Sequence, residues 1–456
     1  MREDLVSYLK GRRVAVLGLG KSGVSTVHLL SRLGARIFVS DLHPSQTSLR
    51  SIKKIEHQHE FGTHSKKILN HELIIVSPGI DWNLPILQKA RALKREVWGE
   101  LELGYQLLQS HKIVAVTGTN GKTTTVSLLG EIFRRSGLKS LVAGNIGSPL
   151  THFVPNKISY DVTDLEVSSY QLEGMSQFHP QVSVVLNLTN DHLKRHKTME
   201  NYSSIKERIF MNQGIKDFTV LNWDDPWCKK MAIKCPAQII WFSKGKLNVG
   251  VGWDKIKNKI VANLCNRTFF FTPAPHLYGS HNIENSCAAI AAALVMGLTQ
   301  KNIQEGLTQF KGVEHRLEEI SKIKGVTYIN DSKGTNVDST LKALESFKQP
   351  LWIILGGQDK GGSYKPIRSF IQKNKKSVKG VRLIGEASQK IFTHLKGVCD
   401  IIVSGTLKKA VDDLTPRARR GDVILLSPAC ASFDQFKSFE DRGLQFKKLV
   451  WKIKKH

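Results

Sequence analysis

The sequence predicts an α/β protein of three domains, each built around a mainly parallel sheet. Its 456 residues are enough for two to four domains of roughly 100–200 residues each. Short runs of β-branched residues alternate with longer helical patterns, as in strand–helix–strand units. Two of the strand-like runs lead directly into glycine-rich turns that are followed by helical patterns. We expect the domains to span residues 1–107, 108–313 and 314–456.

The first domain begins with a helical stretch, followed by strands expected at residues 14–17, 37–40 and 73–76. The first strand runs into the sequence GLGKSG, from Gly18 to Gly23, and the second ends at Asp41. A GxGxxG cluster in this context is typical of a Rossmann-like fold that holds a pyrophosphate at a helix N-terminus. From these residues alone, an NAD site with Asp41 on the ribose hydroxyls remains open. So does a turn that only packs the helix closely on the strand.

The second domain contains the strongest motif. A strand expected at residues 113–116 leads into TGTNGKTTT, residues 117–125, and then into a helix. Glycines in such a P-loop-type turn let successive backbone N–H groups point at phosphate oxygens. Lys122 can then reach the terminal phosphates, and the Thr123 hydroxyl can ligate Mg²⁺. The general pattern has a glycine five residues before Gly121. Val116 stands there and the glycine is Gly118, so the loop is a variant.

Further strands are expected along the rest of the chain. In the second domain they lie at residues 140–143, 162–167 and 182–188, and residues 219–271 extend the same domain with short β-like runs. An Ala-rich helix is expected over residues 282–296. The third domain repeats the strand-then-turn pattern at residues 351–355, 381–384 and 423–426. This alternation predicts a third parallel sheet.

Composition narrows the classes of function. Lys and Arg number 67 against 39 Asp and Glu, a formal charge of +28. The basic residues are scattered and no RNA-recognition or zinc-finger signature is present, so we expect no nucleic-acid partner, although a basic nucleic-acid-binding ATPase stays an alternative. The six cysteines form no CxxC pair, which favours free thiols in a reducing compartment. No cleavage signal and no apolar run of about 20 residues is found. We therefore expect a cytoplasmic protein without membrane contact.

Together the motifs resemble those of the Mur ligases, from residue 14 to about residue 446. The matching stretches are GTNGKTTT (118–125), GNIG (144–147), LEVSSYQLE (165–173), NLTNDH (187–192), GSHNIEN (279–285), EHR (314–316), NDSKGTN (330–336) and SPACASFDQF (427–436). The stretches at 330–336 and 427–436 resemble those of the members that add D-glutamate to UDP-N-acetylmuramoyl-L-alanine. Another Mur ligase activity, or that of a folylpolyglutamate synthase, remains an alternative within the superfamily.

The resemblance implies a two-step reaction in peptidoglycan precursor synthesis. ATP phosphorylates the alanine carboxylate, and the amine of D-glutamate then displaces phosphate from the acyl phosphate. The implied cofactors are ATP and two Mg²⁺ ions, and the implied partners are small-molecule substrates of a monomer. The first domain is implied to be Rossmann-like but to bind UDP, the central one to bind ATP, and the C-terminal one to be Rossmann-like as well. Arg316 and Lys360 lie outside the domain with the phosphate loop, so we expect the domains to close on their ligands.

The resemblance also implies a role for individual residues. The catalytic residues would be Lys122, His192 and Lys206. ATP would contact Gly118, Thr119, Asn120, Gly121, Lys122, Thr123, Thr124, Asn282, Asn285, Arg316 and Asp331. The metal ions would be held by Thr123, Glu166, His192 and Lys206, the last as a carbamate formed with CO₂. The UDP precursor would contact Gly18, Leu19, Gly20, Lys21, Ser22, Gly23, Asp41, Asn145 and Ser168. D-Glutamate would be held by Thr335, Lys360, Ser432 and Phe439.

Two of these assignments depend strongly on the resemblance. The family often has a hydroxyl and a basic residue after the aspartate, whereas Leu42 and His43 follow Asp41 here, which leaves the contact with uracil open. Without the resemblance, Lys206 would be interpreted as one more exposed lysine.

Overall fold

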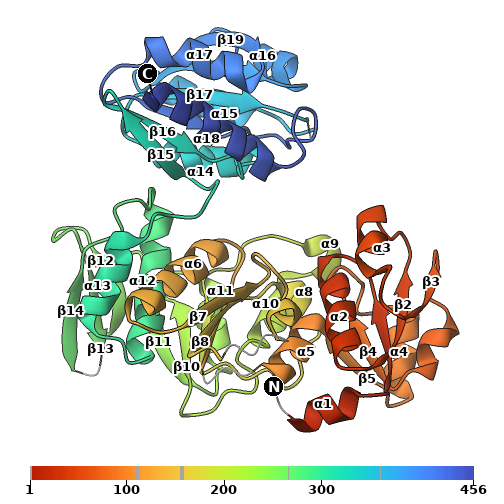
Figure 1. Ribbon diagram of the computed structural model, residues 1–456. Helices are drawn as coiled ribbons and strands as arrows, with labels where there is room; N and C mark the ends of the chain where they lie inside the picture. Colours follow the sequence, from red (N-terminus) through yellow and green to blue (C-terminus); the bar gives the residue numbers. More distant parts are fainter. Residues whose placement is uncertain (1–2, 109–111, 155–158, 265, 360, 456) are drawn as a thin grey trace. The chain divides into compact units, whose positions relative to one another are not determined.

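The computed structural model describes residues 3–108, 112–154, 159–264, 266–359 and 361–455. It contains three sheets, of five, nine and six strands, with helices packed against them (Figure 1). This confirms the predicted α/β class with three sheet-based domains. The chain forms two compact units, Met1–Thr272 with Glu284–Leu307, and Pro273–Ile283 with Thr308–His456. The first unit holds two of the sheets and the second holds one, and the domain bounds near residues 107 and 313 stay predictions.

The N-terminal sheet has the strand order β3-β2-β1-β4-β5 with every pair parallel. Alternate residues of β1, β2 and β4 belong to two different buried apolar clusters, so the inner strands are covered on both faces. The elements are α1 (Glu3–Leu9), β1 (Arg13–Leu17), α2 (Lys21–Arg32), β2 (Arg36–Asp41), α3 (Gln46–Ile52), β3 (Gln58–Phe61), the 3₁₀ helix η1 (Lys66–Asn70), β4 (Leu73–Val76), α4 (Pro85–Ala92), β5 (Glu96–Gly99) and α5 (Glu100–Leu107).

The central sheet has the order β14-β13-β12-β11-β10-β9-β6-β8-β7, parallel except for the pairs that β13 makes. The predicted extension over residues 219–271 therefore supplies the consecutive strands β10 to β14, which end at one edge of this sheet. The elements are β6 (Ile113–Thr117), α6 (Lys122–Arg135), β7 (Ser140–Gly144), α7 (Leu150–Phe153), β8 (Val162–Glu166), α8 (Ser169–Leu172), β9 (Val182–Val185), α9 (Leu193–His196), α10 (Met199–Glu207), β10 (Phe218–Asn222), α11 (Pro226–Ala232), β11 (Gln238–Ser243), β12 (Gly250–Asp254), β13 (Lys259–Leu264), β14 (Arg267–Phe271), α12 (Ser280–Val295) and α13 (Gln300–Gln309).

The C-terminal sheet has the order β15-β16-β20-β17-β18-β19, with one antiparallel pair, β15–β16, at its edge. Two buried apolar clusters lie in this unit, and both contain strand residues of the sheet. The elements are β15 (Glu318–Ile323), β16 (Val326–Asn330), α14 (Val337–Glu345), β17 (Leu351–Gly356), α15 (Lys365–Lys373), β18 (Val378–Ile384), α16 (Ser388–Leu395), β19 (Asp400–Gly405), α17 (Leu407–Arg417), β20 (Val423–Leu426) and α18 (Phe439–Lys455).

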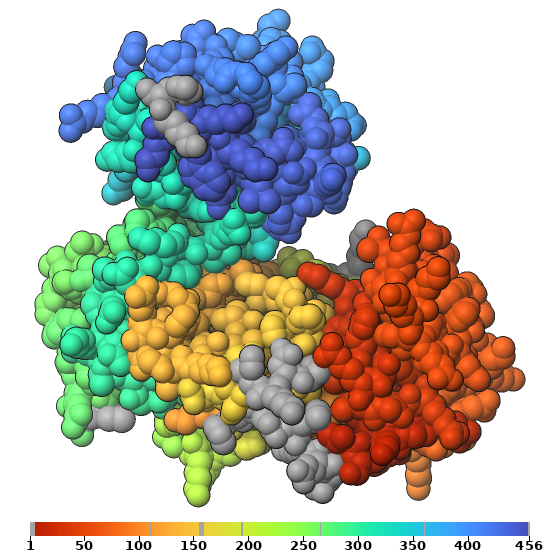
Figure 2. Space-filling model, viewed as in Figure 1, coloured from red at the N-terminus to blue at the C-terminus, as the bar shows by residue number. Residues whose placement is uncertain are grey.

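The N-terminal and central sheets belong to one compact unit, and their domains contact each other directly (Figure 2). Two glycines make a close backbone approach there, since the Gly99 N–H donates to the Gly174 carbonyl over 2.9 Å. A Cβ on Gly174 would lie 2.7 Å from the Gly99 Cα, so a larger residue would push the chains apart. The Lys21 ammonium also donates to the Gly147 carbonyl over 2.9 Å.

Among the described helices, none is both long and apolar enough to cross a membrane.

Candidate functional site

The phosphate loop lies between β6 and α6, as the sequence predicts. Gly118 and Gly121 adopt φ values of +148° and +88°, which residues with a Cβ rarely adopt. A Cβ on Gly121 would lie 2.2 Å from the Asn285 Oδ1. The Lys122 ammonium folds back over the loop and donates to the Gly118 and Thr119 carbonyls, each over 2.9 Å. Glycine is thus required both by the turn and by the neighbouring helix α12.

The loop is held from outside by the segment that follows β9. Asn120 and Asn187 make reciprocal bonds: the Asn120 N–H donates to the Asn187 Oδ1 over 2.9 Å, and the Asn187 amide donates to the Asn120 carbonyl over 3.2 Å. The Thr119 hydroxyl donates to the Thr189 carbonyl over 3.3 Å and accepts from the Thr189 N–H over 3.1 Å. Asn187 and Thr189 were not assigned a role from the sequence. The signal was present in the NLTNDH stretch, whose first residue is Asn187.

Glu166 lies at the end of β8, beside the first turn of α6. Its Oε2 accepts from the Thr123 hydroxyl and its Oε1 from the Asn145 amide, each over 2.8 Å. The carboxylate is 3% exposed. A hydroxyl and a carboxylate in direct contact form an oxygen-rich donor set of the kind that Mg²⁺ prefers. The structure thus brings together three residues predicted for metal and substrate contacts, and the next loop member, Thr124, lies buried within α6.

Lys206, on α10, is buried and not exposed as its sequence context alone suggests. The residue is only 1% exposed. Its Nζ donates to the Thr117 hydroxyl over 3.2 Å and to the Gly118 carbonyl over 3.1 Å. Burial, and after it the charge of Lys122, lower the pKa of Lys206 well below its ordinary value. The two groups that accept hydrogen bonds from its Nζ, a hydroxyl and a carbonyl, are both neutral, so an uncharged amine fits this position better than an ammonium.

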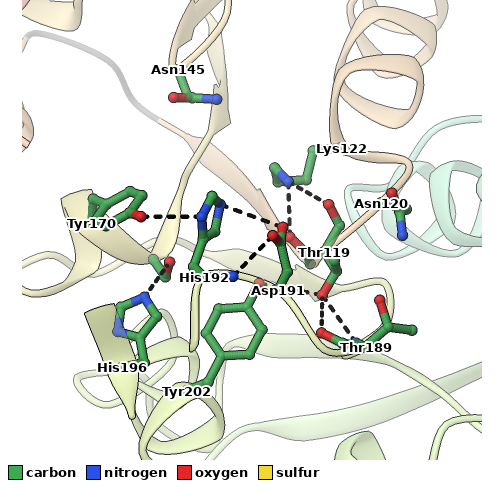
Figure 3. A network of polar contacts seen from close by, with 12 residues as sticks. Thr119, Asn120, Lys122, Asn145, Tyr170, Thr189, Asp191, His192, His196 and Tyr202 are labelled. Carbon is green, nitrogen blue, oxygen red and sulfur yellow. Dashed lines mark hydrogen bonds and ion pairs between the residues drawn. The ribbon is translucent and has the colours of Figure 1, made fainter. Parts of the chain in front are cut away.

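His192 lies next to this cluster, in the loop before α9 (Figure 3). Its Nδ1 lies 3.1 Å from the Tyr170 hydroxyl and its Nε2 lies 3.4 Å from the Asp191 carboxylate. The backbone at His192 has a φ of +53°, an uncommon conformation that often accompanies a functional constraint. The ring thus stands between a phenol and a carboxylate on a constrained turn.

Tyr202 is a site residue that the sequence analysis missed. It is 1% exposed, and its hydroxyl lies 3.2 Å from the Thr119 hydroxyl. Either hydroxyl can donate in this contact, and the Tyr202 hydroxyl donates when Thr119 points its hydrogen at the Thr189 carbonyl. The Lys206 Nζ lies 4.7 Å from the centre of the Tyr202 ring. The spacing of four residues on one helix could have identified Tyr202, because such pairs share a face.

The glycine loop of the N-terminal domain has the expected place between β1 and α2. Gly18 has a φ of +85°, and a Cβ on Gly23 would lie 1.9 Å from the Gly18 carbonyl oxygen. Asp41, at the end of β2, accepts from the Leu19 and His43 N–H groups with its two oxygens. It therefore ties the loop to the neighbouring strand. The remaining predicted members, Gly20, Lys21 and Ser22, form the cap and first residues of α2.

Ser168, predicted to contact the precursor, caps helix α8. Its hydroxyl accepts from the Gln171 N–H over 3.4 Å, while the Gln171 side chain accepts from the Ser168 N–H over 3.0 Å. This reciprocal capping box gives Ser168 a structural role of its own.

Asn282 and Asn285 both lie in the first turns of α12, as predicted. The Asn282 amide donates to the Tyr278 carbonyl over 2.6 Å. Asn285 is 5% exposed and approaches the phosphate loop at Gly121.

The remaining predicted residues lie in the second unit. They are found before β15, on the loops that follow β16 and β20, and at the start of α18. Asp331 is 5% exposed, and burial raises its pKa to about 7. Its carboxyl accepts from the Ser427 hydroxyl over 2.7 Å and from the Leu317 N–H over 3.2 Å. The other described members are Arg316, which is half-buried before β15, Thr335, which follows β16, Ser432, which is 2% exposed, and Phe439, the first residue of α18. Lys360 lies outside the described residues.

Arg442 is a second residue that sequence reasoning missed. It is fully buried in α18, and its guanidinium donates to the Ser332, Cys430 and Ala431 carbonyls over 2.9, 3.2 and 3.2 Å. Burial lowers the pKa of Arg442 to about 10. The side chain joins the two loops that carry Asp331 and Ser432. No local pattern marks it, because its partners are backbone carbonyl groups 11, 12 and 110 residues away in the sequence.

Three family models match consecutive parts of the chain. Residues 12–99 match the MurD-like N-terminal domain of Mur ligases, residues 116–293 the Mur ligase middle domain, and residues 315–430 the glutamate ligase domain of Mur ligases.

Similar proteins span the whole chain. Proteins named "UDP-N-acetylmuramoylalanine--D-glutamate ligase" from Clostridioides difficile and Koribacter versatilis are each 41% identical to it, over 98% of this chain and 100% and 98% of their own length. The solved structure of MurF ligase from Thermotoga maritima in complex with ADP has a TM-score of 0.59 at 18% identity, covering 98% of this chain and 97% of its own. MurC from the same organism has a TM-score of 0.58 at 17% identity, covering 97% and 99%. The chain belongs to the Mur ligase family, in the group of the D-glutamate ligases.

Proposed function

We propose that this chain is an ATP-dependent ligase that joins D-glutamate to UDP-N-acetylmuramoyl-L-alanine through an acyl-phosphate intermediate. The observation that carries the proposal is 41% identity, over 98% of the chain, to a relative that bears the name of this activity. The cluster of Lys122, Thr123, Glu166 and Lys206 at the carboxyl ends of β6 and β8 supports it. We also propose that the protein is cytoplasmic and monomeric.

In the first step, the terminal phosphoryl group of ATP passes to the alanine carboxylate, and ADP leaves. The N–H groups of the phosphate loop and the Lys122 ammonium would bind the phosphates. Thr123 and Glu166, whose oxygens lie 2.8 Å apart, would hold a first Mg²⁺, and His192 would help to hold a second. Bound Mg²⁺ supplies charge stabilisation where two anions must meet. The Lys122 ammonium would place its positive charge beside the phosphoryl group that is transferred. Thr119 and Asn120 would keep the phosphate loop in its conformation.

Lys206 would act as a carboxylate rather than as an amine. Because burial lowers its pKa, the amine has a free electron pair with which it can attack the carbon of CO₂. A nitrogen–carbon bond forms, one carbon–oxygen electron pair moves to oxygen, and the nitrogen loses a proton, which leaves a carbamate anion. A negative group beside Thr117 and Gly118 would attract a metal ion, whereas an ammonium would repel it.

In the second step, the amine of D-glutamate attacks the carbonyl carbon of the acyl phosphate, phosphate leaves, and the nitrogen loses a proton. Thr335, Lys360, Ser432 and Phe439 would hold the amino acid. Arg316 would meet the phosphates of ATP, Asp331 its ribose, and Asn282 and Asn285 its adenine.

The UDP part of the precursor would bind at the glycine loop from Gly18 to Gly23. The backbone there is preorganised by Asp41, which accepts from the Leu19 N–H. Asn145 would contact the muramoyl-alanine end from beside Glu166, and Ser168 would lie near it.

The test is release of inorganic phosphate by the purified protein with Mg²⁺, ATP and UDP-N-acetylmuramoyl-L-alanine. D-Glutamate is compared with L-glutamate, D-alanine and no acceptor. We expect release with D-glutamate alone, and formation of the amide product by mass spectrometry. Equal release with every acceptor, or none with D-glutamate, would refute the proposal, and preference for another amino acid would assign a different Mur ligase activity.

A further inference from the structure

Two loops of the C-terminal domain are joined next to the residues expected to hold the acceptor. Gln358, after β17, and Ala431, after β20, exchange backbone hydrogen bonds of 2.9 and 3.2 Å. Ser432 follows Ala431, and Asp359 follows Gln358. We call residues 358–359 and 431–432 the bridged platform. It carries a carboxylate, Asp359, although the acceptor expected beside it has two carboxylates of its own.

Asp359 is held by three donors. The Lys390 ammonium, on α16, donates to its Oδ2 over 2.6 Å. The Tyr364 hydroxyl and the Gly361 N–H donate to its Oδ1 over 3.1 and 3.2 Å. The hydrogen bond from Lys390 is the main cause that holds the pKa of Asp359 below its usual value. The carboxylate is therefore ionised, and Lys390 supplies the compensating charge.

On the side of this cluster away from the surface, Asp359 contacts a buried tyrosine. Tyr364 is 2% exposed, and its hydroxyl also lies 3.1 Å from the Cys430 sulfur. Cys430 precedes Ala431, so one tyrosine contacts both loops of the bridged platform. Removing the Lys390 charge would thus leave Asp359 in place, still held by Tyr364 and Gly361. Lys390 is the cation that pairs with Asp359 among the described residues. Without it, the negative charge of Asp359 would oppose an anionic acceptor, because like charges at close range oppose binding.

We propose that Lys390 is a positioning residue for the acceptor amino acid, which neutralises Asp359 so that the bridged platform accepts a dicarboxylate. The inference rests on the proposed function. Lys390 need not touch the acceptor, because it acts through Asp359. Two consequences follow. Loss of the Lys390 charge weakens acceptor binding, and simultaneous loss of the Asp359 charge cancels that effect.

The test is a double-mutant cycle measured by steady-state phosphate release with D-glutamate varied. We expect Lys390→Met to raise the KM for D-glutamate about tenfold, with kcat and the KM for ATP changed less than about twofold. Lys390→Arg keeps the charge and should stay near wild type. Asp359→Asn keeps an oxygen for Tyr364 and Gly361, and we expect the double variant Asp359→Asn/Lys390→Met to return to a KM near that of wild type.

The matched control is Lys408→Met. Lys408 makes an ion pair of the same length, 2.6 Å, with Asp412 on α17 of the same domain, and its loss should leave all constants unchanged. An unchanged KM in Lys390→Met, or a double variant as impaired as Lys390→Met, would overturn the inference. Should Lys390→Met not fold, Lys390→Gln takes its place in the cycle under the same criteria. If wild type shows no phosphate release that depends on D-glutamate, the proposed function fails. If wild type is active and Lys390→Met matches it, only this inference fails.

Discussion

Asp164 lies in the core of the central domain and makes its stability depend on pH. It is fully buried on β8, and its Oδ2 accepts from the Ser140 hydroxyl over 2.7 Å. Its Oδ1 has no hydrogen-bond partner among the described residues. Burial raises the pKa of Asp164 from 3.8 to about 8. At pH 7 the folded protein therefore keeps this carboxyl protonated, whereas the unfolded chain ionises it.

The sign and size of the effect follow from this difference. Because the folded pKa is raised, the contribution to stability is complete below pH 3.8 and is lost as the pH rises towards 8. Each pH unit in this window lowers the free energy of unfolding by about 1.4 kcal/mol. Between pH 5.5 and 7.5 the loss is roughly 2–3 kcal/mol. Asp164→Asn cannot ionise and still offers an oxygen to Ser140, so this part of the pH dependence should vanish.

We would measure urea unfolding at both pH values and follow it by hydrogen–deuterium exchange of a peptide that contains β8. The difference between wild type and variant removes the pH effects that they share. Asp161→Asn is the control, because Asp161 is exposed and its carboxylate accepts the Lys139 N–H on the surface. Equal losses of stability with pH in wild type and Asp164→Asn would refute the reasoning.

Three further predictions concern the site. Lys122→Ala should lower phosphate release by more than about 100-fold while binding of the UDP precursor, measured by calorimetry, stays near wild type; full activity would exclude the phosphate-loop role. Lys206→Ala should be nearly inactive and regain part of its activity with formate or acetate, which can supply the missing carboxylate, and an unchanged rate would remove Lys206 from the site. Tyr202→Phe loses its bond to Thr119, about 1 kcal/mol, so kcat/KM should fall about fivefold, and loss of thermal stability without that fall would show a role in folding only.

Much of the fold could be predicted from contiguous residues. The sequence predicts β4 at its observed residues, 73–76. It also predicts the ends of β6, before Gly118, and of β2, at Asp41, to within one residue. These strands are predictable because buried parallel strands are short apolar runs between turn signals. The strand expected at residues 182–188 was predicted too long. β9 ends at Val185, since Asn187 turns away to bind Asn120 of the phosphate loop. A local pattern does not contain that contact.

Some residues of the site could likewise be predicted from the sequence, and others could not. The phosphate loop was predictable because its glycines, Lys122 and Thr123 are neighbours in sequence, and their conformations follow from their own backbone preferences. The burial of Lys206 was not, because its partner Thr117 is 89 residues away. The sequence by itself determined the strands, the turns and the chemical groups that the chain can offer. Only the tertiary structure decided which of those groups lose contact with water, and this decides their charge, because the free energy of an ion depends on everything packed around it.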